Sequence, residues 1–281
     1  MTEITGRTQL AGVIGEPVRH SRSPQIHNAA YREVGLDWVY VGLEVPDGLG
    51  DVAVASMSTL GIRGLNVTMP HKDAAARACD HLSPTAVALG GVNTVVLDED
   101  GKLRGDSTDG AGFLACIEEE GLDVTDRTVL VLGAGGAARA VVRAVASLSA
   151  EVIVVARRQE AGTIAASLAP NGATGEWGDA MRLAARADVL VNATPIGMTA
   201  TRLPLGGADA ELPVPGEGQW AIDLVYEPLR TEFMKAAEGA GAAVVGGLGI
   251  LVHQAALAFE QMTGVPAPLE VMREAAVGGV K

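Results

Sequence analysis

The chain of 281 residues is 48% hydrophobic and 20% charged, which is typical of a globular protein long enough for two domains. Its formal net charge of −13 argues against nucleic acid or an anionic membrane as a partner, and it requires that an anionic ligand be met by local positive groups. Two cysteines, Cys79 and Cys116, are too few for a disulfide framework and indicate a reducing, cytoplasmic compartment.

The first hundred residues predict an alternation of strands and helices. Apolar runs predict strands at 10–14, 39–43, 64–68 and 92–97. A helix is expected from Ser23, as N-cap, and Pro24 to Gly35, and two more lie at about 50–60 and 73–80. This alternation predicts an α/β first domain.

A glycine-rich turn begins at Gly133, after an amphipathic helix at 108–120 and an apolar strand at 128–132. It is made of Gly133, Ala134, Gly135, Gly136 and Ala137, and it opens a helix. Strand, tight turn and helix form the dinucleotide-binding arrangement, although flavin and methyl-donor proteins share such a loop. More than a hundred residues precede it, so a domain that holds the other reactant is expected in front.

The rest of the chain is expected to complete this second domain and then to return to the first. Further strands are expected at 152–156, 189–192, 221–225 and 243–245, with a loop at 199–220. Helices at 250–262 and 269–276 are expected to pack back on the first domain. We therefore predict a substrate domain at 1–108, completed by 246–281, and a doubly wound Rossmann domain at 109–245, with a cleft between them. No secretory signal opens the sequence, and the glycines of the uncharged stretch 239–259 argue against a membrane helix.

The residues after the second strand of the Rossmann pattern bear on the cofactor. About 20 residues beyond such a loop, an Asp or Glu binds the ribose diol of NAD. Here the place holds Ala156, Arg157 and Arg158, whose guanidinium groups suit the 2′-phosphate of NADP. Alternatively, Arg157 and Arg158 are ordinary surface residues that only make a loop more soluble. Their position directly after the second strand favours the interpretation as NADP-binding residues.

Several polar segments are hard to explain by folding alone. They lie at 21–24, 66–72, 92–94, 105–110, 192–198, 223–228 and 251–254. In this order, and over essentially the whole chain, they resemble the shikimate dehydrogenase family. The resemblance implies a catalytic lysine at Lys72 with Asp109 as its partner carboxylate. A solvated lysine is the alternative for Lys72, but a helix start is a poor place for a cation.

The same resemblance implies the ligand contacts. Its substrate-binding positions are Ser21, Ser23, Thr68, Asn93, Tyr226 and Gln254. Its cofactor-binding positions beyond the glycine loop and the arginines are Thr194, Leu224 and Gly247. Hydroxyls at a helix start suit a carboxylate, and amides suit a polyol. A turn-capping role for Asn93 or Gln254, and a core role for Tyr226, remain open.

The resemblance implies a reversible NADPH-dependent reduction of 3-dehydroshikimate to shikimate. The sequence leaves open whether the protein is a monomer or a homodimer. The alternatives are an NAD-dependent quinate/shikimate dehydrogenase, a catalytically silent ligand-binding regulator, and a methylene-folate dehydrogenase. Four residues depart from the usual family pattern. Ser107 bears on the support of Asp109, and Ile250 is a mild apolar exchange beside the nicotinamide. Ala156 and Arg158 leave the degree of NADP preference open. The five histidines lack metal-ligand spacing, so no metal is expected.

Overall fold

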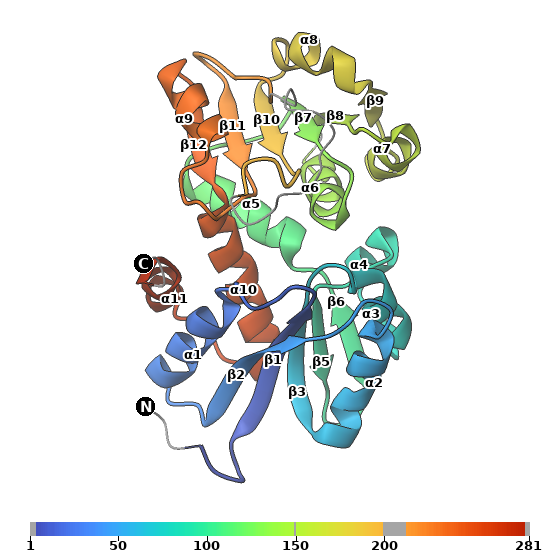
Figure 1. Cartoon of the computed structure of the whole chain (residues 1–281), viewed down its shortest axis with the longest axis vertical. Coiled ribbons are helices and arrows are strands. Elements are labelled where there is room, and N and C mark those ends of the chain that lie inside the picture. Colours follow the sequence, from blue (N-terminus) through green and yellow to red (C-terminus); the bar gives the residue numbers. More distant parts are fainter. Residues whose placement is uncertain (1–3, 149, 199–211, 279–281) are drawn as a thin grey trace. The chain divides into compact units, whose positions relative to one another are not determined.

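The computed structural model describes residues 4–148, 150–198 and 212–278, so most of the loop expected at 199–220 lies outside the described residues. The chain forms two compact units (Figure 1), one ending at Gly112 and resuming at Val252, the other running from Phe113 to Leu251. These limits fall inside two helices, α5 (Asp109–Glu119) and α10 (Gly247–Thr263). The domain limits expected from the sequence stay a prediction.

The first unit contains a mixed six-stranded sheet in the order β2-β1-β3-β5-β6-β4. Its strands are β1 (Gln9–Gly15), β2 (Trp38–Glu44), β3 (Ile62–Val67), β4 (His81–Leu82), β5 (Thr94–Leu97) and β6 (Leu103–Asp106). β1 lies parallel to β2 and β3, whereas β5 runs antiparallel to β3 and β6. The carboxyl ends of β1, β2 and β3 therefore meet at one edge of the sheet, where the polar segment that follows β3 begins.

Helices cover this sheet on both faces. They are α1 (Ser23–Glu33), α2 (Gly50–Leu60), α3 (Lys72–Ala78), α4 (Pro84–Leu89), most of α10, and α11 (Leu269–Gly278). Val54 and Met57 of α2 pack with Ala75 of α3 against buried strand residues such as Leu65. α1 packs on α11, and Arg22 donates from Nη1 to the carbonyl oxygen of Ala276 at 2.7 Å. The end of the chain is thereby tied to its first helix.

One local expectation about α1 is wrong. Ser23 is the first residue of the helix and not its N-cap, a position that Arg22 occupies with a φ of −86° and no side-chain capping bond. Because Arg22 already has helical dihedral angles, the helix starts one residue early and the Ser23 hydroxyl does not cap it. The backbone N–H of Ser23 donates instead to Ser21 Oγ at 3.3 Å.

The second unit is a doubly wound parallel sheet in the order β12-β11-β10-β7-β8-β9. Its strands are β7 (Thr128–Leu132), β8 (Glu151–Val155), β9 (Ala173–Gly175), β10 (Val189–Asn192), β11 (Trp220–Asp223) and β12 (Ala243–Gly246). Numbered from β7, this is the 3-2-1-4-5-6 order of dinucleotide-binding folds. The predicted Rossmann arrangement is confirmed.

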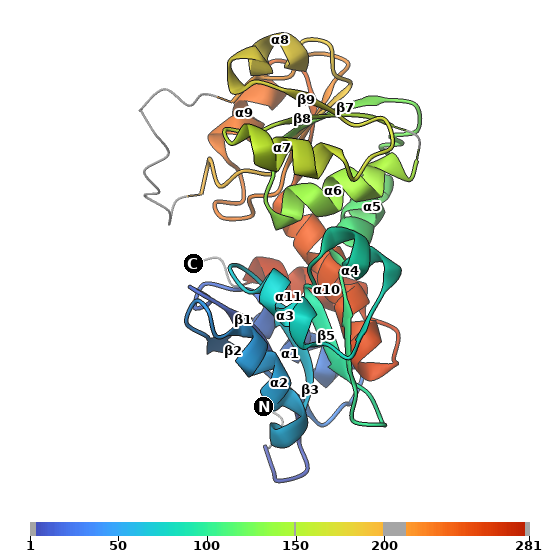
Figure 2. The same ribbon diagram turned by 90° about the vertical axis from the view of Figure 1, so that its right-hand side faces the viewer.

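Alternate residues of β7 are buried on opposite faces of this sheet, which explains its uninterrupted apolar run. Val129 and Val131 pack with α6 (Gly136–Ala146) and α7 (Gln159–Ala166), which Figure 2 shows on one face. Leu130 and Leu132 pack with α8 (Ala180–Ala184) and α9 (Glu232–Gly239). A 3-10 turn, η1 (Trp177–Asp179), precedes α8.

Several observed elements have no counterpart among those expected from the sequence. β4, β9 and α8 have two, three and five residues, too few for a hydrophobic period to show. β6 follows a turn at 98–101, in which Gly101 has a φ of 75° and donates from its N–H to the Asp98 carbonyl at 3.1 Å. That hairpin makes the first sheet mixed.

Candidate active site

Lys72 and Asp109 form an ion pair at the starts of two helices in the first unit. Lys72 is the first residue of α3 and Asp109 the first residue of α5, and Nζ lies 2.5 Å from Asp109 Oδ2. Each side chain is 22% exposed, so the pair is held by protein but still reachable. The carboxylate suits the positive end of α5, and it offsets the poor position of the ammonium group at the positive end of α3.

Asn93 holds the other oxygen of the carboxylate. Its Nδ2 lies 2.7 Å from Asp109 Oδ1 and 3.2 Å from Oε1 of Gln254 on α10. The Oδ1 of Asn93 accepts the backbone N–H of Thr108 at 2.8 Å. Because one end of the amide meets a pure donor and the other a carboxylate, its orientation is determined. The structure thus brings together four residues expected from the sequence: Lys72, Asp109, Asn93 and Gln254.

The remaining substrate positions of the first unit follow β1 and β3. Thr68 comes directly after β3 and is half-buried, and its backbone N–H donates to the Ile14 carbonyl of β1 at 3.0 Å. A Cβ on Gly15 would come within 2.4 Å of the Thr68 methyl group, so glycine is needed there. Ser21 and Ser23 lie together at the start of α1.

A buried chain of hydrogen bonds leads toward the pair. Tyr40 of β2 donates to Asn66 Oδ1 at 2.6 Å, and Asn66 Nδ2 lies 3.1 Å from Thr94 Oγ1. Thr94 in turn donates to Asn93 Oδ1 at 2.9 Å. No role was expected for Tyr40, Asn66 or Thr94. The sequence could have indicated Asn66, because it lies two residues before Thr68 and so faces the same side of the strand. Tyr40 could not have been found in this way, because in the sequence it resembles an ordinary core residue.

In the second unit the glycine-rich turn leaves β7 at the carboxyl edge of the sheet. Gly133 has a φ of 110°, and a Cβ there would lie 2.7 Å from the Ala193 carbonyl oxygen, so only glycine fits. Gly135, the N-cap of α6, has no side chain to cap the helix, and apart from its chain neighbours no described atom lies within 4 Å of the position a Cβ would take. The first turn of α6 therefore presents N–H groups beside open space, which suits a pyrophosphate.

The two arginines occupy the position expected for recognising the ribose. Arg157 and Arg158 follow β8 and are exposed, and Arg158 is the N-cap residue of α7. The Gly133 N–H donates to the Val155 carbonyl at 2.8 Å, which places the end of β8 beside the start of the glycine-rich turn. The two arginines thus follow the strand next to the glycine-rich turn.

Thr194, Leu224 and Gly247 meet at the ends of β10, β11 and β12. Thr194 donates to Asn192 Oδ1 at 2.6 Å, and the Leu224 N–H donates to the Asn192 carbonyl at 3.0 Å. A Cβ on Gly247 would come within 2.5 Å of the Leu224 carbonyl oxygen. These three expected positions therefore lie at the carboxyl edge of the sheet, where ligands of such folds bind.

A buried carboxylate supports this edge. Asp223 at the end of β11 accepts from Asn192 Nδ2 at 2.9 Å and from Thr231 Oγ1 at 2.6 Å. Burial raises the pKa of the Asp223 carboxyl, and the hydrogen bonds from Thr231, Val225 and Asn192 act in the opposite direction. Tyr226 follows three residues later and is half-buried. It belongs to the second unit, unlike the other expected substrate residues.

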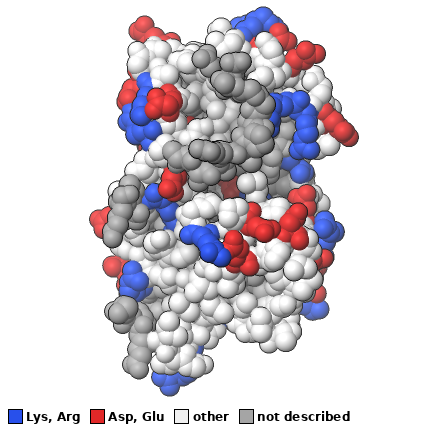
Figure 3. Space-filling view, in the orientation of Figure 1, with Lys and Arg blue, Asp and Glu red and all other residues white. Residues whose placement is uncertain are grey.

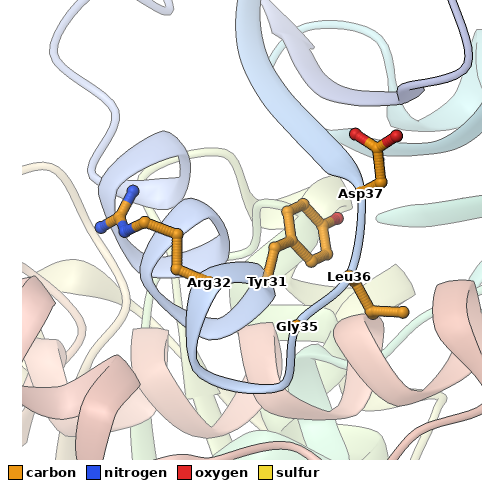
Figure 4. A pocket seen from close by; sticks show the side chains of 5 residues that line it. All are labelled: Tyr31, Arg32, Gly35, Leu36 and Asp37. Atoms are coloured by element: carbon orange, nitrogen blue, oxygen red, sulfur yellow. The ribbon is translucent and has the colours of Figure 1, made fainter. Parts of the chain in front are cut away.

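Other surface features of the described residues are less suited to chemistry. A hollow of about 180 Å³ at the end of α1 (Figure 4) is lined by Tyr31, Arg32, Gly35, Leu36 and Asp37, none of which was expected to act. The face in Figure 3 mixes basic and acidic side chains. Within the ranges that the structure describes, there is no group of three or more potential metal ligands and no helix apolar and long enough to cross a bilayer.

The chain is similar to known proteins along nearly its whole length. Residues 13–95 match the shikimate dehydrogenase substrate binding domain, and residues 247–277 match the shikimate 5′-dehydrogenase C-terminal domain. A shikimate dehydrogenase (NADP(+)) of Methanopyrus kandleri is 45% identical and covers 97% of this chain and 96% of its own. A structure of shikimate 5-dehydrogenase from Thermus thermophilus in complex with NADP(H) and shikimate is 36% identical, with a TM-score of 0.84 over 97% of this chain and all of that one. A quinate dehydrogenase from Corynebacterium glutamicum in complex with NAD is 30% identical, with a TM-score of 0.85 over 96% and 99% of the two chains.

Proposed function

Because the chain belongs to the shikimate dehydrogenase family, we propose that it catalyses the reversible NADPH-dependent reduction of the C3 ketone of 3-dehydroshikimate to shikimate, within aromatic amino-acid biosynthesis. It is an oxidoreductase that acts on a CH–OH group. The observation that carries this function is the pairing of Lys72 with Asp109, with Asn93 holding the second carboxylate oxygen.

The pair accounts for the proton that ketone reduction needs. Bound NADPH supplies the hydride to the carbonyl carbon, and the carbonyl oxygen then has to gain a proton. The Lys72 ammonium group is a donor that also favours the developing negative charge on that oxygen. Asp109 keeps Nζ in place at 2.5 Å, and we assign the exchanged proton to the dyad as a whole.

We assign recognition of the substrate to the polar residues of the first unit. The hydroxyls of Ser21 and Ser23, at the start of α1, take the carboxylate of the acid. Thr68, Asn93 and Gln254 take the ring hydroxyls, since their hydroxyl and amide groups can both donate and accept. We assign Tyr226 of the second unit to the carboxylate side.

NADP is the cofactor, and the residues of the second unit fit it. Gly133, Ala134, Gly135, Gly136 and Ala137 offer the N–H groups of a helix start to the pyrophosphate, and the open space at Gly135 leaves room for it. Arg157 and Arg158 take the 2′-phosphate, where an acidic residue would repel it. We assign Thr194, Leu224 and Gly247 to the nicotinamide half.

The second candidate is the NAD-dependent oxidation of quinate, because a quinate dehydrogenase shares this fold at a TM-score of 0.85. The two exposed arginines after β8 argue against it. We further propose that the protein works in the cytoplasm as a monomer or homodimer. A catalytically silent regulator is disfavoured, because both members of the dyad are present and paired.

A steady-state assay tests the proposal. Shikimate and quinate are each offered with NADP and with NAD, and the reduced nicotinamide is followed by its absorbance. The highest kcat/KM is expected for shikimate with NADP. A higher kcat/KM for quinate with NAD would replace the proposed reaction by the second candidate, and no turnover with any pair would favour the regulator.

A matched pair of variants tests the role of the dyad. Lys72→Ala should lower kcat by about 10²-fold or more, because the proton donor is lost. Lys102→Ala is the control, since Lys102 is an exposed lysine that pairs with a different carboxylate, Asp80, at 3.2 Å. A kcat of Lys72→Ala within about threefold of wild type would overturn the assignment.

A further inference from the structure

Tyr40 is a fully buried residue of β2 that donates to one atom of the polar network. Its residue exposure is 1%, and its hydroxyl lies 2.6 Å from Asn66 Oδ1. Burial raises the pKa of Tyr40 well above its usual value, so the phenol keeps its proton. Tyr40 is therefore a neutral phenol that can donate its hydrogen bond at neutral pH.

Asn66 needs this donor because its other end is committed. Asn66 Nδ2 lies 3.2 Å from the carbonyl oxygen of Asn93, which can only accept. The Nδ2 group must therefore face Asn93, and Oδ1 must face Tyr40. Asn66 is 7% exposed, so without the phenolic proton its Oδ1 would be a buried acceptor with a lost partner.

Asn66 in turn holds the segment that carries Asn93. Its amide reaches both the Asn93 carbonyl and Thr94 Oγ1, at 3.2 and 3.1 Å. The Thr94 hydroxyl, having accepted that bond, donates its own proton to Asn93 Oδ1 at 2.9 Å. Asn93 then holds Asp109 Oδ1 at 2.7 Å, and Asp109 holds Lys72. A continuous series of hydrogen bonds therefore runs from the strand β2 to the catalytic dyad.

We propose that Tyr40 is a positioning residue for the reaction: by donating to Asn66 it holds Asn93 against Asp109 and so keeps Lys72 aligned with the reacting oxygen. The proposal rests on the proposed function, because alignment of the dyad matters only if the dyad moves a proton. On this proposal a residue of β2 affects kcat, although β2 contributes no atom to the dyad.

A single-atom substitution provides the test. Tyr40→Phe keeps the ring, which stacks on His27 at 4.3 Å, and removes the hydroxyl, which also interacts with the Ser23 side chain. The Asn93 background described below separates the effect through Asn66 from any effect through Ser23. We expect kcat with shikimate and NADP to fall by about tenfold, less than for loss of the lysine, with KM for NADP unchanged. Tyr31→Phe is the matched control. Tyr31 is a buried tyrosine beside the same histidine, and its own hydroxyl makes no hydrogen bond to any described residue. Its kcat should stay within about 1.5-fold of wild type.

A double variant with Asn93 distinguishes a positioning role of Tyr40 from a general loss of structure. If Tyr40 acts through Asn93, then Tyr40→Phe introduced into an Asn93→Ala background should change kcat by less than about 1.5-fold. An equal loss of kcat in both backgrounds would overturn the proposal, as would an unchanged kcat of Tyr40→Phe in the wild-type background. Should Tyr40→Phe fold poorly, Thr94→Val breaks the same series of bonds and should give the same pattern.

A second measurement does not depend on turnover. The side-chain amide signal of Asn93 in a ¹H–¹⁵N spectrum, identified by its absence in Asn93→Ala, should shift in Tyr40→Phe and not in Tyr31→Phe. An unshifted signal in Tyr40→Phe would overturn the proposal. A wild-type protein that does not oxidise shikimate would refute the proposed function instead, so the two failures are distinguishable.

Discussion

His27 of α1 should make the first unit lose stability as the pH falls. Its side chain is fully buried, and neither ring nitrogen makes a hydrogen bond to the residues that the structure describes. The ring stacks on Tyr40 at 4.3 Å and lies 6.1 Å from the ring of Tyr31. Burial lowers the pKa of His27 to about 3, from an ordinary value of 6.5. Both tyrosines are neutral, because burial raises the pKa of each, so neither of them supplies a negative charge to an imidazolium ion there.

The sign follows from which state binds the proton. The unfolded chain takes up a proton at His27 near pH 6.5, whereas the folded chain does so only near pH 3, so acid favours the unfolded state between these values. The stability is intact above the unfolded pKa and falls as the pH drops below it. At about pH 5 the difference is roughly 1.5 pH units at 1.36 kcal/mol each, or about 2 kcal/mol.

Replacing His27 by Phe isolates this contribution. The aromatic ring is kept, while the titrating group and its two unpaired nitrogens are removed. Between about pH 7.5 and 5, the wild-type protein should lose about 2 kcal/mol more of its free energy of unfolding than His27→Phe does. All other groups titrate in both proteins, so their effects cancel in the comparison.

The assay should report on the first unit alone, because two units need not unfold together. Trp38 of β2 lies 5.4 Å from Tyr31, whereas the other tryptophans, Trp177 and Trp220, belong to the second unit. Urea unfolding is followed by Trp38 fluorescence after both of the others are changed to Phe. His81→Gln is the control, since it replaces an exposed histidine and leaves the buried ring of His27 in place. If wild type and His27→Phe lose the same stability to within about 0.5 kcal/mol, the reasoning is refuted.

Three further outcomes are expected. Arg157→Ser should raise KM for NADP by about tenfold while changing KM for NAD little, because the variant removes the charge-assisted bond that we propose between Arg157 and the 2′-phosphate. An equal change for both cofactors would contradict that role. Thr231→Ala should lower the free energy of unfolding by about 2 kcal/mol, measured by urea denaturation, since Thr231 caps α9 by accepting from the Met234 N–H and also donates to the buried Asp223. An unchanged midpoint would show that neither bond matters. Gly112→Ala should lower both Tm and kcat, because its Cβ would lie 2.5 Å from the backbone nitrogen of Gln254; a wild-type kcat with a lowered Tm would show that the contact serves folding only.

Much of the candidate site was predictable because its residues stand at the ends of recognisable strands. The apolar run of β7 and the glycines after it predict a phosphate-binding turn, and parallel pairing then requires Thr194 and Leu224 to lie at the same edge of the sheet. Lys72 and Asp109 were expected as a pair from the family resemblance, and the structure has them in contact. The assignments of individual residues to substrate and cofactor stay predictions.

The sequence by itself determined where polar groups interrupt apolar strands, because strand and helix periods are local properties of the chain. It did not determine which of those groups touch. Tyr40 and Asn66 are 26 residues apart, and Asn93 and Gln254 are 161 apart, so their hydrogen bonds exist only once β2, β3 and α10 have packed. The antiparallel β5, which brings Thr94 opposite Asn66, was likewise decided by tertiary pairing. Orientation of a buried amide depends on every donor and acceptor around it, and those come from distant parts of the chain.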